Sequence, residues 1–271
     1  MKISNIFKET KLAPTETEIF LSSILEKDRS FIIAYPEFEI NFSDYHKFKE
    51  FEARRKLHEP VAYILGYKDF YRSRIRSDKR AAIPRAETES LIEEAVKFIF
   101  RIPNRERKNH LASDPTYKIA DVGTGSACIA ISLAKILPFA HIFAIDIDHK
   151  ALSLAEENVA EHNLTNQITL MQGDLLNPIS TSVDLIVANL PYIPSHKLNT
   201  LETQIKNWEP LLAFDGGTDG KQHYKNLFSQ ATNKLAQSGI IVYEVDGKAN
   251  IWQHPFSIYQ SEESSRKEGL I

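Results

Sequence analysis

The sequence predicts an α/β fold in which a parallel sheet is preceded by a small helical domain and a β-hairpin. From Lys118 onward, short apolar runs typical of buried strands alternate with segments of helical period, and this alternation indicates a parallel sheet. Upstream, residues 15–58 carry apolar side chains at helical spacing. Residues 67–83 instead show short stretches of alternating apolar and polar residues, which predict a hairpin.

Segment boundaries follow from these periods. We expect a helical domain at residues 1–65, a hairpin linker at 66–84, the α/β domain at 85–260 and a polar tail without fixed structure at 261–271. Asn41 and Ser43 indicate that a helix begins near Asp44. Further helices are expected at 87–100, 150–162 and 222–236, a polar linker at 103–117, and strands at 118–122, 141–145, 167–171, 183–188 and 239–245.

Composition argues against several classes of protein. The chain has 271 residues, 42% of them hydrophobic, which is enough for at least one sizeable core. Its single cysteine, Cys128, has no histidine motif beside it, so we interpret it as a packing residue. The nine histidines show no metal-ligand spacing, and no apolar run approaches the roughly 20 residues of a membrane span. The N-terminal residues lack a targeting pattern. We therefore expect a cytoplasmic protein that uses neither a metal nor a membrane.

Positive charge is concentrated in residues 47–85. This stretch holds twelve Lys or Arg against five Asp or Glu, an excess of seven, whereas the whole chain carries a net charge of −3. The excess is consistent with a solvated helix face and hairpin. It is equally consistent with a docking surface for an acidic partner, either a protein or a nucleic acid, and charge alone does not separate these interpretations.

A glycine turn between a strand and an apolar helix predicts a ligand-binding loop. Gly123 and Gly125 let the backbone approach a ligand closely, and the start of the following helix offers free N–H groups. Asp121 stands just before the glycines, where a carboxylate would repel the phosphates of a dinucleotide and suits a cationic cofactor better.

Two further strands end in carboxylates. Asp146 lies 23 residues after Gly123, the distance expected for a carboxylate that accepts hydrogen bonds from ribose hydroxyls. Asp174 and Leu175 follow the next strand, where a carboxylate and an apolar side chain could hold the amine and the face of an adenine. The sequence therefore predicts a nucleoside-containing cofactor, and NAD would fit the glycines and Asp146 as well.

The fourth strand end carries Asn189, Leu190, Pro191 and Tyr192. The Asn189 oxygen and the Leu190 carbonyl can accept both hydrogens of a planar NH₂ group, while the Tyr192 ring lies against its face. Pro191 stiffens the bend and keeps Leu190 out of the α region. The tetrapeptide contains no Asp, Glu or His, so we expect no strong general base within it.

Together with these strand ends, motifs at residues 54–66, 70–71, 83–89 and 209–220 resemble the peptide chain release factor glutamine methyltransferases, from about residue 15 to about residue 245. The resemblance implies a Rossmann-like S-adenosylmethionine methyltransferase sheet, and a helical domain that docks the substrate. It implies that Asn189 to Tyr192 hold the glutamine of a Gly-Gly-Gln loop in a release factor. It also implies that S-adenosylmethionine is held by Asp121, Gly123, Thr124, Gly125, Ser126, Ala127, Asp146, Asp174, Leu175 and Asn189.

The chain departs from the usual family pattern at Leu190, Ala127 and Ala86, where the family has proline, glycine and proline. Position 190 would act through its carbonyl, and a methyl group at 127 only narrows the cofactor loop, so we expect altered affinity rather than altered chemistry. The C-terminal segment departs further. We expect only residues 256–259 to form a strand after 239–245, which would leave a sheet edge uncovered.

Other functions stay open at this point. A ribosomal-protein glutamine and a nucleic-acid adenine also present a flat NH₂ group to Asn189 and Tyr192. An adenine in DNA would require a base-reading module and room for a flipped nucleotide, whereas the additional material here is a short helical domain, which disfavours a nucleic acid. Outside the enzymes, the alternative is a non-catalytic module that binds S-adenosylmethionine or a protein partner.

Overall fold

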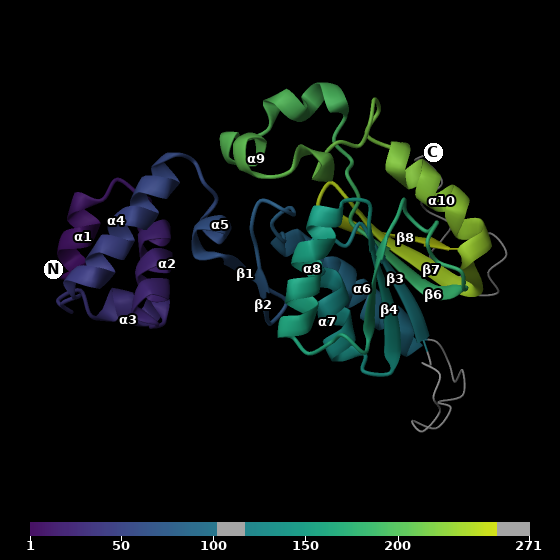
Figure 1. The fold of residues 1–271 in the computed structure, drawn as a ribbon, viewed down its shortest axis with the longest axis horizontal. Coiled ribbons are helices and arrows are strands. Elements are labelled where there is room, and N and C mark those ends of the chain that lie inside the picture. Colours follow the sequence, from purple (N-terminus) through teal and green to yellow (C-terminus); the bar gives the residue numbers. More distant parts are fainter. Residues whose placement is uncertain (102–116, 254–271) are drawn as a thin grey trace.

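The computed structural model describes residues 1–101 and 117–253, and its N-terminal helices form a separate group beside the α/β region (Figure 1). These helices are α1 (Ile3–Glu9), α2 (Pro14–Leu25), α3 (Arg29–Ala34), α4 (Phe42–Lys56) and α5 (Val61–Leu65). The predicted start of α4 is confirmed, because the Asn41 side chain accepts a hydrogen bond from the N–H of Asp44 at 2.8 Å. Buried Phe20, Phe48 and Phe51 lie at the centre of this group.

A two-stranded hairpin connects the helical group to the sheet. Strands β1 (Tyr67–Phe70) and β2 (Ser73–Arg76) pair antiparallel, and Tyr71 and Arg72 form the turn with φ angles of 41° and 63°. These are the left-handed conformations that a two-residue hairpin turn requires. The strands are shorter than the sequence predicts, since residues 77–83 contain no strand.

The predicted Rossmann-like sheet is confirmed. Its six strands lie in the order β5-β4-β3-β6-β7-β8, and the first five in that order are parallel. The strands are β3 (Tyr117–Val122), β4 (Ala140–Asp146), β5 (Ile168–Gln172), β6 (Val183–Ala188), β7 (Leu235–Val245) and β8 (Lys248–Gln253). The helices are η1 (Ala86–Thr88), α6 (Glu89–Arg101), α7 (Cys128–Ile136), α8 (His149–Glu161), η2 (Ser195–Thr200), α9 (Thr203–Trp208), η3 (Leu211–Ala213) and α10 (Gln222–Lys234).

Helices cover both faces of the sheet. Along β6, Leu185 and Val187 face the core formed with α6, α7 and α8, whereas Ile186 and Ala188 face the core formed with α10. A strand that is apolar on both faces is typical of a parallel sheet. Cys128 lies buried in the first core, as expected for a packing residue, and burial raises the pKa of its thiol to about 12.

The expectation of an uncovered edge after β7 is wrong. Strand β8 pairs antiparallel with β7 from Val245–Lys248 to Ile240–Gln253, and the Trp252 ring stacks on Phe228 at 5.6 Å between centroids. Asp246 and Gly247 form the turn with φ angles of 52° and 70°. Asp-Gly is a strong hairpin signal, so this strand could be read from the sequence. The strand expected at 256–259 and the expected tail lie outside the described residues, as does most of the predicted polar linker.

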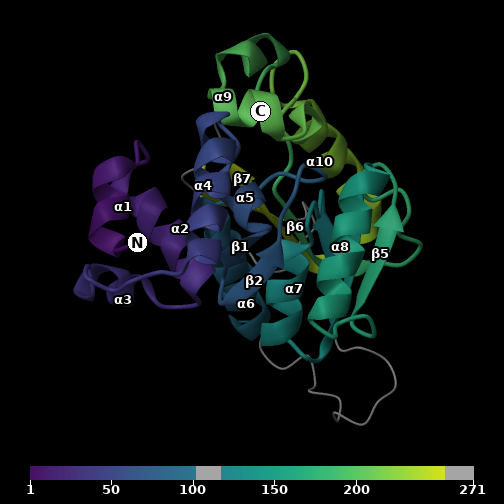
Figure 2. The ribbon, with the colours of Figure 1, turned by 60° about the vertical axis from the view of Figure 1, so that its left-hand side comes forward.

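The helical group contacts the α/β region through Trp208, at the end of α9. Figure 2 shows α9 next to one end of α4. The indole N–H of Trp208 donates to the carbonyl of Leu57 at 3.2 Å, and its ring packs against Ala62, Tyr63 and Ile83. The Tyr63 hydroxyl in turn donates to the carbonyl of Ala81 at 2.8 Å. Helices near the N-terminus therefore touch a segment located more than half the chain away.

Most of the basic side chains in residues 47–85 form ion pairs within the chain. Arg55 pairs with Glu16 at 2.7 Å, Arg80 with Glu157 at 2.6 Å and Arg76 with Glu161 at 3.1 Å. Eight of the twelve are paired: Lys49, Arg54, Arg55, Lys56, Arg74, Arg76, Arg80 and Arg85. Much of the local excess charge is thus matched by acidic residues, several of them from the sheet domain, which favours the structural interpretation over a basic docking surface.

Candidate functional site

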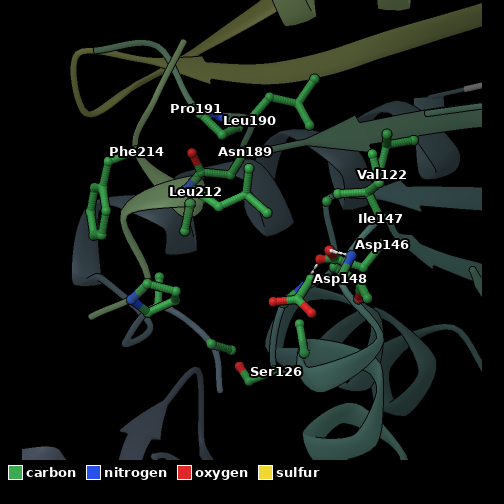
Figure 3. A pocket seen from close by; sticks show the side chains of 18 of the residues that line it. Val122, Ser126, Asp146, Ile147, Asp148, Asn189, Leu190, Pro191, Leu212 and Phe214 are labelled. Carbon is green, nitrogen blue, oxygen red and sulfur yellow. Dashed lines mark hydrogen bonds between the residues drawn. The ribbon is translucent and has the colours of Figure 1, made fainter. Parts of the chain in front are cut away.

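A cavity of about 400 Å³ opens at the carboxyl ends of β3, β4 and β6, where ligands bind in open α/β sheets. Its size is in the range of small-molecule sites. Asn189, Leu212 and Phe214 lie on one side, and Asp146 and Asp148 lie across from them (Figure 3). Of the residues predicted to form the site, the cavity is lined by Gly123, Thr124, Gly125, Ser126, Asp146, Asp174, Leu175, Asn189, Leu190, Pro191 and Tyr192.

The glycine loop lies directly against the Asn189 loop. Gly123 and Gly125 have φ angles of 74° and 56°, a region that glycine adopts without steric cost. A Cβ atom on Gly123 would lie 2.9 Å from Cδ2 of Leu190. Ala127 also has a positive φ of 64° and is fully buried in the core, so its methyl group packs there and does not narrow the cavity.

Asp121 is fully buried behind the glycine loop and does not line the cavity. Its Oδ2 accepts hydrogen bonds from the Thr124 hydroxyl at 2.6 Å and the Ala130 N–H at 3.1 Å. Its Oδ1 has no hydrogen-bond partner among the described residues. Burial raises the pKa of Asp121 to about 7, and the hydrogen bonds oppose this shift only in part. Asp121 thus stabilises the conformation of the glycine loop, and it places a titratable carboxyl group beneath this loop.

Asp146 lines the cavity and fixes two backbone groups. Its Oδ2 accepts from the N–H of Gly125 at 2.8 Å, and its Oδ1 accepts from the N–H of Asp148 at 2.9 Å. Burial raises the pKa of Asp146 above its ordinary value. Helix α8 is capped by Asp148, whose side chain accepts a hydrogen bond from the N–H of Lys150 at 2.9 Å. Helix capping is therefore not the role of Asp146. Each carboxylate oxygen of Asp146 keeps acceptor capacity for a ligand hydroxyl.

The Asn189 carboxamide is held by two residues that the sequence analysis did not place in the site. Its Nδ2 donates to Oγ1 of Thr88 at 2.9 Å and to Oε2 of Glu244 at 3.1 Å. Its Oδ1 accepts no hydrogen bond from the described part of the chain. Thr88 lies within the 83–89 motif. Glu244 lies at the carboxyl end of β7, which is the ligand-binding edge of the sheet, and this strand-end position indicates a site residue.

The backbone after Asn189 is anchored by a buried tyrosine. The Tyr224 hydroxyl accepts a hydrogen bond from the N–H of Leu190 at 3.0 Å and donates a short one to the carbonyl of Glu244. Tyr192 lies half-buried beside the cavity, and burial raises the pKa of its hydroxyl. Tyr224 therefore ties the Asn189 loop to the end of β7.

The mouth of the cavity is apolar, and the segment that forms it is hydrogen-bonded to residues 83–85. Leu212 lines the cavity and is 55% exposed, so the mouth presents uncovered apolar surface. The buried carboxylate of Glu209 accepts from the N–H of Ile83 at 2.9 Å and pairs with Arg85 at 2.5 Å. Within residues 1–101 and 117–253 there is no cluster of three metal-ligating side chains and no helix long and apolar enough to cross a membrane.

Comparisons with known proteins identify the family. Residues 2–66 match the family PrmC N-terminal domain, and residues 108–217 match Methyltransferase small domain. The release factor glutamine methyltransferase of Thermodesulfovibrio yellowstonii is 34% identical over 256 residues, which cover 93% of this chain and 87% of that protein. That of Geobacter sulfurreducens is 33% identical, over 88% of this chain and 78% of that protein. A bifunctional methyltransferase of Rickettsia conorii is 30% identical, over 86% of this chain and 47% of that protein. The chain therefore belongs to the release factor glutamine methyltransferase family.

Proposed function

We propose that this protein transfers the methyl group of S-adenosylmethionine to the side-chain amide nitrogen of the glutamine in the Gly-Gly-Gln loop of peptide chain release factors. Family membership supports the reaction class. The observation that carries the proposal is the Asn189 carboxamide, whose NH₂ group is engaged by Thr88 and Glu244 while its oxygen stays available at the cavity. An oxygen acceptor is the group that a glutamine NH₂ requires.

The cavity suits S-adenosylmethionine in charge and in hydrogen bonding. Its two arginines, Arg80 and Arg85, are paired with Glu157 and Glu209, so neither offers an unpaired positive charge to a phosphate. Asp146 offers acceptors for ribose hydroxyls, and the buried Asp121 adds negative charge beneath the loop when it is ionised. The residues of this site therefore fit a cofactor that is cationic and carries a nucleoside.

The chain's own residues orient a weak nucleophile. An amide nitrogen has a delocalised lone pair, so its reaction depends on placement and on preorganised dipoles. S-adenosylmethionine supplies an electrophilic methyl group. Oδ1 of Asn189 and the carbonyl of Leu190 would each accept one N–H of the substrate amide, which favours positive charge developing on its nitrogen. Leu212 and Phe214 would exclude water from the mouth.

The proton leaves after methyl transfer. The Glu244 carboxylate lies next to Asn189, and its Oε2 accepts hydrogen bonds from both Thr88 and Asn189. We propose that this carboxylate acts on Asn189 and not as a base, and that the proton of the methylated amide passes to water. This agrees with the absence of an acid or base within residues 189–192.

The proposed role extends to the organisation of the chain. Residues 1–65 would dock the release factor, residues 66–84 would link this domain to the catalytic domain at 85–260, and the protein would act in the cytoplasm, where translation takes place. No metal takes part in the proposed reaction.

Transfer of labelled methyl groups tests the proposal. Wild-type protein should label a release factor, and a release factor with Gln→Ala in its Gly-Gly-Gln loop should stay unlabelled. Asn189→Ala should lower kcat by about 10² or more with little change in cofactor affinity, because the lost contact acts mainly during transfer. Labelling of a ribosomal protein or of DNA adenine, with none on the release factor, would reassign the substrate. Cofactor binding without transfer to any of them would leave a non-catalytic module.

A further inference from the structure

Three elements distant in sequence meet at the acceptor side of the cavity, which Thr88, Asn189 and Glu244 all line. Thr88 comes from η1, Glu244 from the end of β7 and Asn189 from the loop after β6. Thr88 and Glu244 are each only 3% exposed. The Thr88 hydroxyl donates to Oε2 of Glu244 at 2.7 Å, and Nδ2 of Asn189 lies 2.9 Å from Oγ1 of Thr88 and 3.1 Å from Oε2 of Glu244. The three polar groups form a closed triangle.

The chemistry of this triangle determines which end of the Asn189 amide faces it. An ionised carboxylate has no hydrogen to donate, so Glu244 can only accept. The Thr88 hydroxyl uses its single hydrogen on Glu244, which leaves only lone pairs toward Asn189. Both neighbours therefore require a donor, and the NH₂ end of the amide satisfies both. The oxygen end must then point away from the triangle.

We propose that Thr88 and Glu244 are positioning residues that hold the Asn189 carboxamide with its oxygen toward the substrate. The inference rests on the proposed function, since it explains how the acceptor of the glutamine NH₂ is oriented. When either acceptor is lost, the amide is no longer held in this orientation, and it can flip and present its own NH₂ to the substrate NH₂. Two donors then face each other, and the reacting nitrogen loses one of the groups that align it.

Matched substitutions separate hydrogen bonding from packing. Thr88→Val keeps the shape of the side chain and removes the acceptor, whereas Thr88→Ser keeps the hydroxyl. Glu244→Met removes the acceptor at similar length, whereas Glu244→Gln keeps an oxygen that can accept from both Thr88 and Asn189. We expect Thr88→Val and Glu244→Met to lower kcat for release factor methylation by about 10²-fold. Thr88→Ser and Glu244→Gln should recover most of that loss.

Three further measurements identify a positioning role. The dissociation constant of S-adenosylmethionine and the KM for release factor should stay close to wild type in all four variants, and thermal melting should show a folded protein. Wild-type kcat in Thr88→Val and Glu244→Met would overturn the inference. Equal losses in the conservative and the acceptor-deleting variants, or a parallel loss of cofactor affinity, would also overturn it, because they indicate a packing role. Failure of the proposed function differs, since the wild-type protein itself would then leave the release factor unmethylated.

Discussion

Gly123 lies directly against Leu190, so the loop that follows β3 and the loop that follows β6 form one surface. A Cβ atom on Gly123 would approach Cδ2 of Leu190 to 2.9 Å, so the Leu190 side chain would have to move, and the φ of 74° at Gly123 disfavours any other residue. The cofactor side and the acceptor side of the cavity are therefore coupled at this contact.

Substitution of Gly123 should disturb both sides of the cavity. We expect Gly123→Ala to lower the free energy of unfolding by about 1–3 kcal/mol and to weaken S-adenosylmethionine binding as well. Gly66→Ala is the matched control, because Gly66 has a φ of 82° but no neighbour within 4 Å of an added Cβ. It should cost about 1 kcal/mol of stability and leave cofactor affinity intact. Chemical denaturation and calorimetry measure the two quantities, and unchanged affinity in Gly123→Ala would contradict the coupling.

Asp146 should bind the ribose of the cofactor. Asp146→Ala is expected to weaken S-adenosylmethionine binding by about 1–3 kcal/mol, the usual loss for a charged acceptor. An analogue without the ribose hydroxyls provides the control. It should bind wild-type protein more weakly than S-adenosylmethionine does, but should bind Asp146→Ala with almost the same affinity as S-adenosylmethionine. If the analogue bound Asp146→Ala more weakly than S-adenosylmethionine by the same factor as in wild-type protein, Asp146 would not contact the ribose.

Asp121 should make cofactor affinity depend on pH. Because burial raises the pKa of Asp121 to about 7, the side chain is mostly protonated at pH 6 and mostly ionised at pH 8. Affinity for the cationic S-adenosylmethionine should therefore rise as pH increases through 7, by about 3- to 10-fold. S-adenosylhomocysteine lacks the sulfonium charge and should show a flatter profile. Asp121→Asn should remove the difference between the ligands, and calorimetry at several pH values checks this.

Glu244 should produce a loss of turnover at acidic pH. Burial, together with Glu87, raises its pKa, while hydrogen bonds from Thr88 and Asn189 act in the opposite direction. Above this pKa the carboxylate accepts from Asn189, and below it the protonated carboxyl can donate to the amide oxygen instead. We therefore expect kcat to fall as pH decreases through the raised pKa.

A side chain that does not titrate provides the control for this fall of kcat at acidic pH. Glu244→Gln keeps an acceptor and should show a kcat that changes much less between acidic and neutral pH. Measurement at saturating S-adenosylmethionine removes the contribution of Asp146, whose pKa is also raised by burial. If kcat of Glu244→Gln fell at acidic pH as it does in wild-type protein, another group would be responsible for the pH dependence.

The sequence was most informative where chemistry coincides with strand ends. Parallel strands end at one edge of a sheet, so Asp146 and Asn189 could be expected at the same cavity without knowledge of the packing. Thr88 could not be placed in the site from the sequence, because its contact with Asn189 spans 101 positions and no local pattern encodes such a pairing. Glu244 lies 55 positions from Asn189, and only its place at the carboxyl end of β7 indicates the site. Strand β8 differs from these two residues, because the Asp246–Gly247 turn that precedes it is a local signal for a hairpin.

The contact between Trp208 and Leu57 limits how this protein can be recombined with its relatives. The indole comes from the segment that walls the cavity mouth, and the carbonyl that it meets lies directly after α4. A chimaera that exchanges only the N-terminal helices would pair a foreign surface with Trp208 and Ile83. An exchange that keeps this contact would have to move Trp208 together with Leu57, Ala62 and Tyr63, so the exchanged set of residues is discontinuous in sequence although it is contiguous in space.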